Sequence, residues 1–283
     1  MELPAARWRR LSMSYDRTSP SWIKAKMNIK QLRFQKQLGQ NFLIDGNVVE
    51  NILSALELEP SDTVVEIGPG LGSLTERLVA RVDRLIAVEI DRHLARELEM
   101  DFPEVEVMPA DILKLDPVQF PEGSKIVGNL PYYITSAIIM HILESDLKFD
   151  RMVIMMQKEV AERISASAGS KTYGVLSVIT QLYCDVELLF HVSSQCYMPA
   201  PRVDSAVVRL KPKPFREKQL IPVVKAAFSS RRKTIQNSLR NIYSSGRVAR
   251  ALEQAGIHPV RRAETLSLEE FIALGEAFNE SDN

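Results

Sequence analysis

Short runs of apolar residues recur through the first two thirds of this 283-residue chain. They have the length of buried strands, and in the stretches between them apolar residues repeat every three or four positions, the spacing of an amphipathic helix. The runs cover residues 63–67, 84–90, 105–108, 125–127 and 152–156. Alternation of strands and helices predicts a parallel sheet with helices on both faces, a Rossmann-like α/β fold.

Two further runs, 186–192 and 206–210, predict an antiparallel pair of strands at one edge of this sheet. A helix is predicted to begin at Asp45 or Asn47, because either side chain can cap the amphipathic stretch that follows.

Beyond Pro212 and Pro214 the pattern is helical only. The expected helices cover residues 221–228, 234–242, 248–255 and 267–278, the last with Ser267 as N-cap and Glu270 completing a capping box. The sequence thus predicts three parts. Residues 1–35, without apolar periodicity, form a flexible basic arm; residues 36–212 form the α/β domain, and residues 213–283 a helical domain.

Formal net charge is zero, but the charges are segregated. Residues 1–36 carry nine Lys and Arg against two acids, and residues 202–250 carry thirteen against two. Such clustering indicates a nucleic-acid footprint on an otherwise acidic protein, and the alternative is a set of solvated helix surfaces.

Cys184 and Cys196 stand apart from any C-x-x-C pair or histidine cluster, so we expect neither a disulfide nor a metal site. Free thiols favour a reducing, cytoplasmic setting. No apolar run approaches the ~20 residues that span a bilayer, so no membrane partner is expected.

A glycine-rich turn follows the first predicted strand, with Gly68, Gly70 and Gly72 alternating. A dinucleotide fingerprint requires its third glycine one residue later, so the turn fits S-adenosylmethionine better, which has no pyrophosphate. Glu89, at the end of the second strand, is expected to accept hydrogen bonds from the ribose hydroxyls, and Asp111, after the third, from the adenine amino group. A capping or solvent-exposed role is the alternative for each acid.

The tetrapeptide Asn129-Leu130-Pro131-Tyr132 follows the fourth predicted strand, at the edge of the sheet where open α/β folds bind ligands. Two acceptors, the Asn129 side-chain carbonyl and the Leu130 backbone carbonyl, suit the two hydrogens of an adenine amino group. Pro131 would fix the turn and Tyr132 would stack on the base. The alternative is a chance turn beside a core tyrosine.

Tyr197 precedes a proline-rich loop, Met198-Pro199-Ala200-Pro201. A stiff extended loop of this kind would present Tyr197 to the opposite face of the same base. The alternative is an aromatic side chain that packs on the edge of the sheet.

With these motifs in place, the chain resembles the ribosomal RNA adenine N6-dimethyltransferases, the small-subunit dimethyladenosine transferases whose loss gives kasugamycin resistance. The resemblance runs from about Lys36 to Phe278. It rests on residues 38–43, 66–72, 88–91, 110–111, 129–132, 173–177, 199–207, 231–234 and 262–267.

The resemblance implies S-adenosylmethionine as methyl donor and N6-dimethylation of two adjacent adenosines in the 3′-terminal hairpin loop of 16S rRNA within the small ribosomal subunit. It implies that residues 41–43 fold over the cofactor. Cofactor contacts are expected at Asn41, Leu43, Gly68, Glu89, Asp111 and Asn129, and RNA contacts at Arg202, Arg231, Arg232 and Lys233. Two features depart from the family: Tyr197 stands where Phe is usual, and residues 1–35 exceed the usual bacterial N-terminus.

Two other functions stay open at this point. One is a large-subunit rRNA methyltransferase of the antibiotic-resistance type, which shares the cofactor and Asn-x-Pro-Tyr motifs; the other is a ribosome-assembly checkpoint in which methylation is secondary. The segment 262–267 and the loop 199–207 favour the small-subunit enzyme. We expect a monomer.

Overall fold

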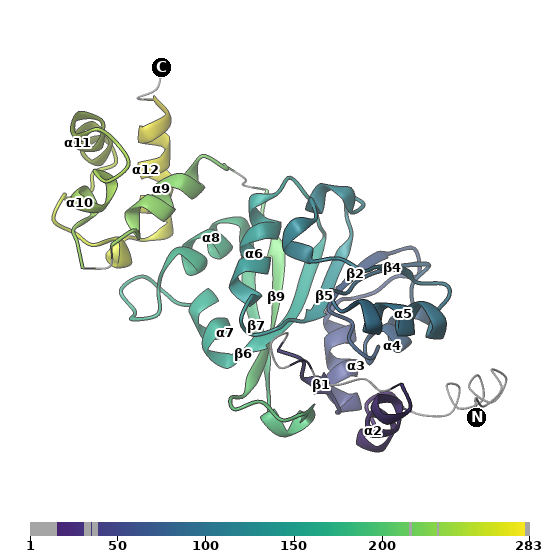
Figure 1. Cartoon of the computed structure of the whole chain (residues 1–283). Coiled ribbons are helices and arrows are strands. Elements are labelled where there is room, and N and C mark those ends of the chain that lie inside the picture. The colour runs from purple at the N-terminus through teal and green to yellow at the C-terminus, as the bar shows by residue number, and fades with distance from the viewer. Residues whose placement is uncertain (1–15, 31–34, 36–38, 215–216, 231, 281–283) are drawn as a thin grey trace. The chain divides into compact units, whose positions relative to one another are not determined.

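A computed structural model of the chain describes residues 16–30, 35, 39–214, 217–230 and 232–280 (Figure 1). The chain forms two compact units. The first comprises Met1–Ile138, Leu147–Lys158 and Leu188–Arg209, and the second comprises Ile139–Asp146, Glu159–Glu187 and Leu210–Asn283.

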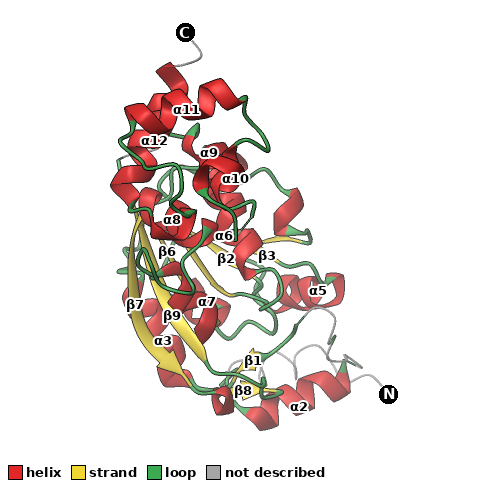
Figure 2. Ribbon diagram, turned by 90° about the vertical axis from the view of Figure 1, so that its left-hand side faces the viewer, coloured by secondary structure: helices red, strands yellow, loops and turns green. Residues whose placement is uncertain are grey.

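A seven-stranded sheet forms the centre of the fold, in the order β4-β3-β2-β5-β6-β9-β7 (Figure 2). Its five strands from β4 to β6 are parallel, and β9 and β7 complete one edge. This confirms the Rossmann-like α/β fold, as a mixed sheet. The strands are β2 Thr63–Ile67, β3 Arg84–Val88, β4 Glu106–Met108, β5 Lys125–Asn129, β6 Arg151–Gln157, β7 Cys184–Val192 and β9 Ser205–Pro212.

The central strands β2, β5 and β6 are almost entirely buried, which is why they appear in the sequence as continuous apolar runs rather than as alternating ones. Parallel strands end at a common edge of the sheet. The loops after β2, β3 and β5 therefore meet at the carboxyl edge, where each carries one of the predicted motifs.

The helices of the first unit pack against single strands: α3 (Gly46–Ala55) lies against β6, α4 (Thr75–Val79) against β3, and α5 (Arg92–Asp101) against β4. Asp45 caps α3 as predicted, since its side chain accepts hydrogen bonds from the amides of Asn47 and Val48. A separate antiparallel pair joins β1 (Phe42–Leu43) to β8 (Tyr197–Met198). Helix α6 (Thr135–Glu144) follows the Asn-Leu-Pro-Tyr segment. Short 3₁₀ turns occupy Ile112–Lys114, Pro117–Gln119, Ser194–Cys196 and Ala263–Thr265.

The expectation of a flexible arm is wrong for residues 16–30. Pro20–Ile29 forms helix α2, in which Ile23 is fully buried and Met27 nearly so. The stretch has other apolar residues, but they do not form one helical face, since Ala25 and Ile29 are exposed, and the packing partners of α2 lie far along the chain. Residues 1–15 and 31–34 lie outside the described residues.

The second unit is mainly helical. Besides most of α6 and the ends of β7 and β9, it contains α7 Lys158–Ile164, α8 Val175–Tyr183, α9 Leu220–Ala227, α10 Ile235–Leu239, α11 Ser245–Gln254 and α12 Leu268–Glu280. The rings of Phe228 and Phe271 stack with centroids 5.8 Å apart in its core. Ser267 and Glu270 form the predicted capping box, each accepting from the other's backbone amide at 3.2 and 2.8 Å. The unit also includes α8, so it extends beyond the expected helical domain at 213–283.

Candidate active site

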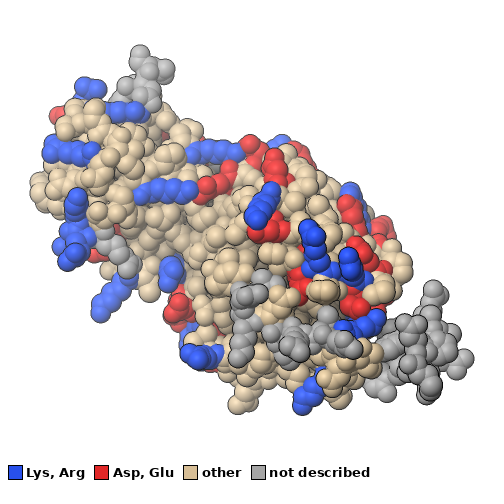
Figure 3. Space-filling model, in the orientation of Figure 1, with Lys and Arg blue, Asp and Glu red and all other residues tan. Residues whose placement is uncertain are grey.

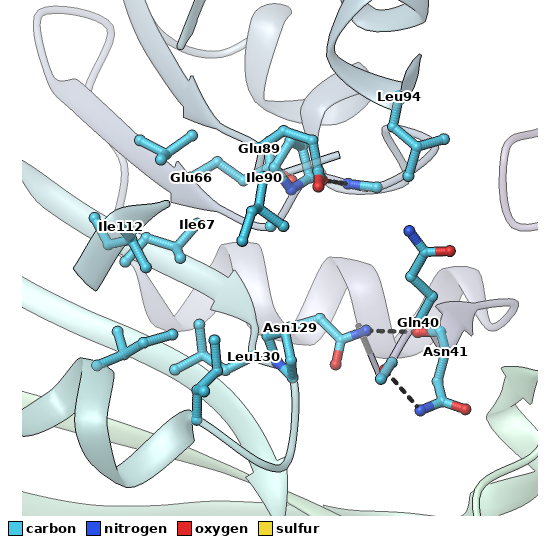
Figure 4. A pocket seen from close by; sticks show the side chains of 18 of the residues that line it. Gln40, Asn41, Glu66, Ile67, Glu89, Ile90, Leu94, Ile112, Asn129 and Leu130 are labelled. Atoms are coloured by element: carbon cyan, nitrogen blue, oxygen red, sulfur yellow. Dashed lines mark hydrogen bonds between the residues drawn. The ribbon is translucent and has the colours of Figure 1, made fainter. Parts of the chain in front are cut away.

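A cavity opens at the carboxyl edge of the sheet, and all of its lining residues belong to the first unit (Figure 4). It collects the glycine turn, the end of β3 and the segment after β5. The predicted residues that line it are Asn41, Leu43, Gly68, Gly70, Glu89, Asp111, Asn129, Leu130, Pro131 and Tyr132. Of the other predicted residues that the structure describes, Tyr197, Arg202, Arg232 and Lys233 do not line this cavity.

The glycine turn needs glycine for two reasons. Gly68 and Gly70 have φ of +70° and +61°, a conformation in which a side chain is strained. A Cβ on Gly70 would also lie 3.0 Å from the ring of Phe42. The turn is therefore shaped to admit both a ligand and the segment at residues 39–43, which we call the flap.

Glu89 ties the glycine turn to the start of α5. Its Oε2 accepts from the Gly70 amide at 3.0 Å and its Oε1 accepts from the Asp91 amide at 2.9 Å. The side chain is 5% exposed, and burial raises the pKa of Glu89 to about 7, although both backbone hydrogen bonds favour the ionised form. Each carboxylate oxygen has a second lone pair, so both can still accept from ligand hydroxyls.

A second buried carboxyl, Glu66, was not predicted as a site residue. It lies on β2, lines the cavity and accepts from the Thr75 hydroxyl at 2.7 Å. Burial, with a smaller contribution from the charge of Glu89, raises the pKa of Glu66 to about 8. An acid inside an otherwise apolar strand is the sequence signal that would have found it. A cation bound in the cavity would stabilise the ionised form of both carboxyls, so the cavity favours a positively charged ligand.

Asp111 stands where predicted, after β4, and also does what the alternative proposed. Its Oδ1 accepts from the Leu113 amide at 3.1 Å and so caps the following 3₁₀ turn. Beside it in the cavity lining, Ile90 is 41% exposed, an apolar surface that sequence reasoning missed. An exposed isoleucine directly after Glu89 is suited to pack on a flat, apolar ring.

The flap is anchored at both ends. Gln35 and Gln40 each donate from Nε2 to the same oxygen of Asp91, at 2.7 and 3.0 Å. At the other end, Leu43 of β1 pairs with Tyr197 of β8. The flap thus forms part of the cavity wall, and the folding of residues 41–43 over a cofactor there stays a prediction.

Asn129 joins the flap to the Asn-Leu-Pro-Tyr segment. Its side-chain Nδ2 donates to the Asn41 carbonyl at 2.9 Å (Figure 4). Because the amide group is planar, this bond fixes which way the carbonyl oxygen of the same side chain points. The amide is thereby held with its acceptor directed away from the flap.

The rest of the segment is equally well held. The Pro131 carbonyl accepts from the Thr135 hydroxyl at 3.0 Å and from the Ile134 amide at 3.2 Å, which joins the turn to α6. The Tyr132 hydroxyl is 2.7 Å from that of Ser205. Tyr132 is therefore positioned at the cavity wall by a bond at the far end of its ring.

Tyr197 is buried in the core, with 3% of its surface exposed, and it lies beside Leu43 and Val207. Its buried hydroxyl lies near the hydroxyls of Tyr132 and Ser205. Tyr197 thus lies behind Tyr132 and does not itself line the cavity, so its stacking on a base stays a prediction.

The predicted RNA-binding cations lie on the surface. Arg202, Arg232 and Lys233 are exposed, and Arg231 lies outside the described residues. On the face that Figure 3 shows, the region of α9–α12 carries mostly Lys and Arg, whereas acids and bases mix over the α/β part. On this face, the excess of basic residues in 202–250 is thus visible over the helical region.

Among the described residues, no helix is long and apolar enough to cross a membrane. Nor do these residues gather three or more His, Cys, Asp or Glu side chains in an arrangement that could hold a metal ion.

Proteins with related sequences carry consistent names. A protein of Levilactobacillus brevis named "Ribosomal RNA small subunit methyltransferase A" is 41% identical over 282 residues, covering 92% of this chain and 95% of its own. A protein of the same name from Alkaliphilus metalliredigens is 42% identical over 274 residues, covering 90% and 96%.

Two solved structures share the fold. A dimethyladenosine transferase from Plasmodium falciparum matches with a TM-score of 0.74 and 26% identity, covering 85% of this chain and 98% of its own. The 23S rRNA methyltransferase ErmE matches with a TM-score of 0.64 and 30% identity, covering 84% and 100%. The family model described as "Ribosomal RNA adenine dimethylase" matches residues 31–280, and the chain therefore belongs to this family of rRNA methyltransferases.

Proposed function

We propose that this protein dimethylates N6 of two adjacent adenosines in the 3′-terminal hairpin loop of 16S rRNA, within the small ribosomal subunit, during its maturation. The observation that carries the proposal is the fixed Asn129 amide in the wall of the cavity that the glycine turn and Glu89 also line. We further propose that the protein acts as a monomer in the cytoplasm and needs no metal.

S-adenosylmethionine, the methyl donor that this family implies, supplies an electrophilic methyl group. The cavity suits it because Glu66 and Glu89 favour a cation and Ile90 offers an apolar face. Glu89 would accept from the ribose hydroxyls and Asp111 from the adenine amine. The flap, through Asn41 and Leu43, would shield the donor from water.

The residues after β5 would act on the target amine. An adenine N6 is a poor nucleophile because its lone pair is delocalised into the ring. The Asn129 side-chain carbonyl and the Leu130 backbone carbonyl would each hold one amine hydrogen and turn the lone pair toward the methyl group. As the new N–C bond forms, the donor's C–S bond breaks, and the resulting ammonium gives its proton to solvent. Catalysis would then rest on positioning and electrostatics rather than on a strong base.

The relatives favour the small subunit over the large one as substrate. Proteins named for small-subunit methylation are 41% and 42% identical to this chain over nine tenths of its length, whereas ErmE is 30% identical. The cavity itself does not distinguish the two, because both activities present an adenine amine to the same motif.

A transfer assay tests the proposed substrate. Purified protein with labelled S-adenosylmethionine is expected to deliver about four methyl groups to each unmethylated small subunit, two on each adenosine, since an adenine N6 can take two. Large subunits serve as the matched control. Label in large-subunit RNA, or stable binding of small subunits without transfer by intact protein, would contradict the proposal.

The pKa of Glu89 predicts a pH dependence of donor binding. A carboxyl with a pKa of about 7 is largely protonated at pH 6. The ionised carboxylate accepts hydrogen bonds from the ribose hydroxyls of the methyl donor better than the protonated acid does. Donor affinity should therefore rise by about tenfold from pH 6 to pH 8, as binding releases the proton. In Glu89→Gln the affinity should be weaker and this pH step should be absent.

Calorimetric titration at several pH values measures this effect. Glu66→Gln is the matched control, because it removes the other buried acid and should retain the Glu89 step. If Glu89→Gln kept both the wild-type affinity and the wild-type pH dependence, Glu89 would not contact the donor.

The cations at residues 231–233 are proposed to bind rRNA phosphates. Arg232 and Lys233 are exposed just before Thr234, which caps α10 with its hydroxyl. Positive charge at a helix N-terminus opposes the helix dipole, and residues 218–250 contain no acid to offset it. Cations placed where they destabilise the helix suggest that they bind an anion outside the protein.

Replacing Arg231, Arg232 and Lys233 with alanine should weaken rRNA binding and flatten its salt dependence, by about 0.7–0.9 in slope for each phosphate that the protein no longer neutralises. The control triple Arg84→Ala, Arg96→Ala and Lys148→Ala removes the same charge from exposed positions outside the helical domain. Binding to small subunits across a salt series separates the two. Equal slopes in both triples would mean that the cations at 231–233 do not bind phosphate.

A further inference from the structure

Arg17 is a buried cation in the part of the chain that precedes the family match. The family match begins at residue 31, and Arg17 lies three residues before the start of α2 at Pro20. The arginine is only 4% exposed. A guanidinium cannot lose its proton in a protein, so it must have close partners where it is buried.

Those partners come from three separate places. Nη1 donates to the Leu71 carbonyl at 2.8 Å, and Nη2 donates to Asp101 Oδ2 at 3.0 Å. Nε lies 3.7 Å from the Glu76 carboxylate. The guanidinium carbon is 4.3 Å from the centre of the Phe102 ring and 4.9 Å from that of Trp22. Each edge of the guanidinium is thus engaged, and aromatic rings lie close to it.

The first of these partners belongs to the glycine turn. Leu71 stands between Gly70, whose amide donates to Glu89, and Gly72, where a Cβ would lie 3.3 Å from Arg17 Nη1. The turn is therefore held by a carboxylate at the Pro69–Gly70 peptide and by a guanidinium at the Leu71–Gly72 peptide. The first of these peptides borders the cavity, and the second directly precedes Ser73 and Leu74, which also line it.

Helix α2 adds an apolar contact to the same elements. Ile23 and Met27 share one cluster with Phe42 of the flap, Leu71 of the turn and Leu94 of α5. Phe42 and Leu94 also line the cavity. The helix thus packs directly behind part of the cavity wall.

An ion-pair network fastens the helix in place. Lys26, 7% exposed, lies 2.9 Å from both Glu97 and Asp101 of α5, and Lys30 lies 3.1 Å from Glu97. Asp101 receives both Lys26 and Arg17, so the helix and the guanidinium share one anchor. Breaking one partner of such a partly buried network leaves the other charge uncompensated, so the network favours this position of the helix.

We propose that Arg17 is a positioning residue for the methyl-donor site, and that residues 16–30 form a brace that keeps the glycine turn in its binding conformation. A turn that is already ordered loses less conformational freedom when a ligand binds, so the brace would raise donor affinity without touching the donor. The inference rests on the proposed use of S-adenosylmethionine.

The test compares Arg17→Met with Arg84→Met in the full chain. Methionine keeps much of the arginine volume but cannot donate to Leu71, and Arg84 is an exposed arginine, paired with Glu106, away from the cavity. For Arg17→Met we expect the KM for S-adenosylmethionine to rise about tenfold, equivalent to about 1.4 kcal/mol, with kcat and the KM for RNA changed less than about twofold. Arg84→Met should match the wild type, and Arg17→Lys, which keeps the charge, should recover part of the loss.

A second measurement separates an effect on S-adenosylmethionine binding from a general loss of folding stability. The rise in Tm that saturating S-adenosylmethionine produces is taken against each variant's own unliganded Tm, so general destabilisation cancels. That rise should be smaller for Arg17→Met than for the wild type. If Arg17→Met left both the KM for S-adenosylmethionine and the ligand-induced rise in Tm unchanged, residues 16–30 would not act as a brace for the donor site. If the wild type itself failed to bind S-adenosylmethionine in calorimetry, the proposed function would fail instead.

Discussion

The hydrogen bond from the Asn129 side chain to the Asn41 carbonyl joins the two halves of the site. On one side of it lies the flap that lines the cavity; on the other lies the segment proposed to hold the target base. Because one amide nitrogen is committed to the flap, the acceptor oxygen has a defined direction. In the proposed reaction the methyl donor is already reactive, so the main contribution of the protein is to orient the amine with fixed hydrogen-bond acceptors.

The electrostatic character of the cavity follows from burial. Glu66 and Glu89 lie at the carboxyl edge of neighbouring strands, and low exposure raises the pKa of both. A cationic ligand would relieve that cost, whereas a dinucleotide would bring further negative charge. This is consistent with S-adenosylmethionine, the cationic methyl donor that the family implies. The proposed brace at residues 16–30 acts on the shape of the site, because Arg17 contacts the same glycine turn that Glu89 holds through the Gly70 amide.

The strands were predictable because parallel strands buried on both faces leave continuous apolar runs, and the motifs at their ends followed from topology. What could not be predicted depends on contacts between distant residues. The apolar residues of helix α2 do not form one face, and the helix is held by Glu97 and Asp101, some 75 residues away in the case of Lys26 and Asp101. Likewise, the local pattern around Tyr197 indicated a loop, and its burial arises from pairing with Leu43.

The central claim is that Asn129 acts on the reacting amine, and single-turnover kinetics test it most directly. Asn129→Ala should lower the rate of methyl transfer by about 10²-fold or more while the affinity for small subunits changes little, as expected when an oriented acceptor is removed from a reaction centre. Asn47→Ala, a substitution of an exposed asparagine outside the cavity, is the control. A normal single-turnover rate in Asn129→Ala, with binding of the subunit abolished, would contradict the account and make the segment a docking element.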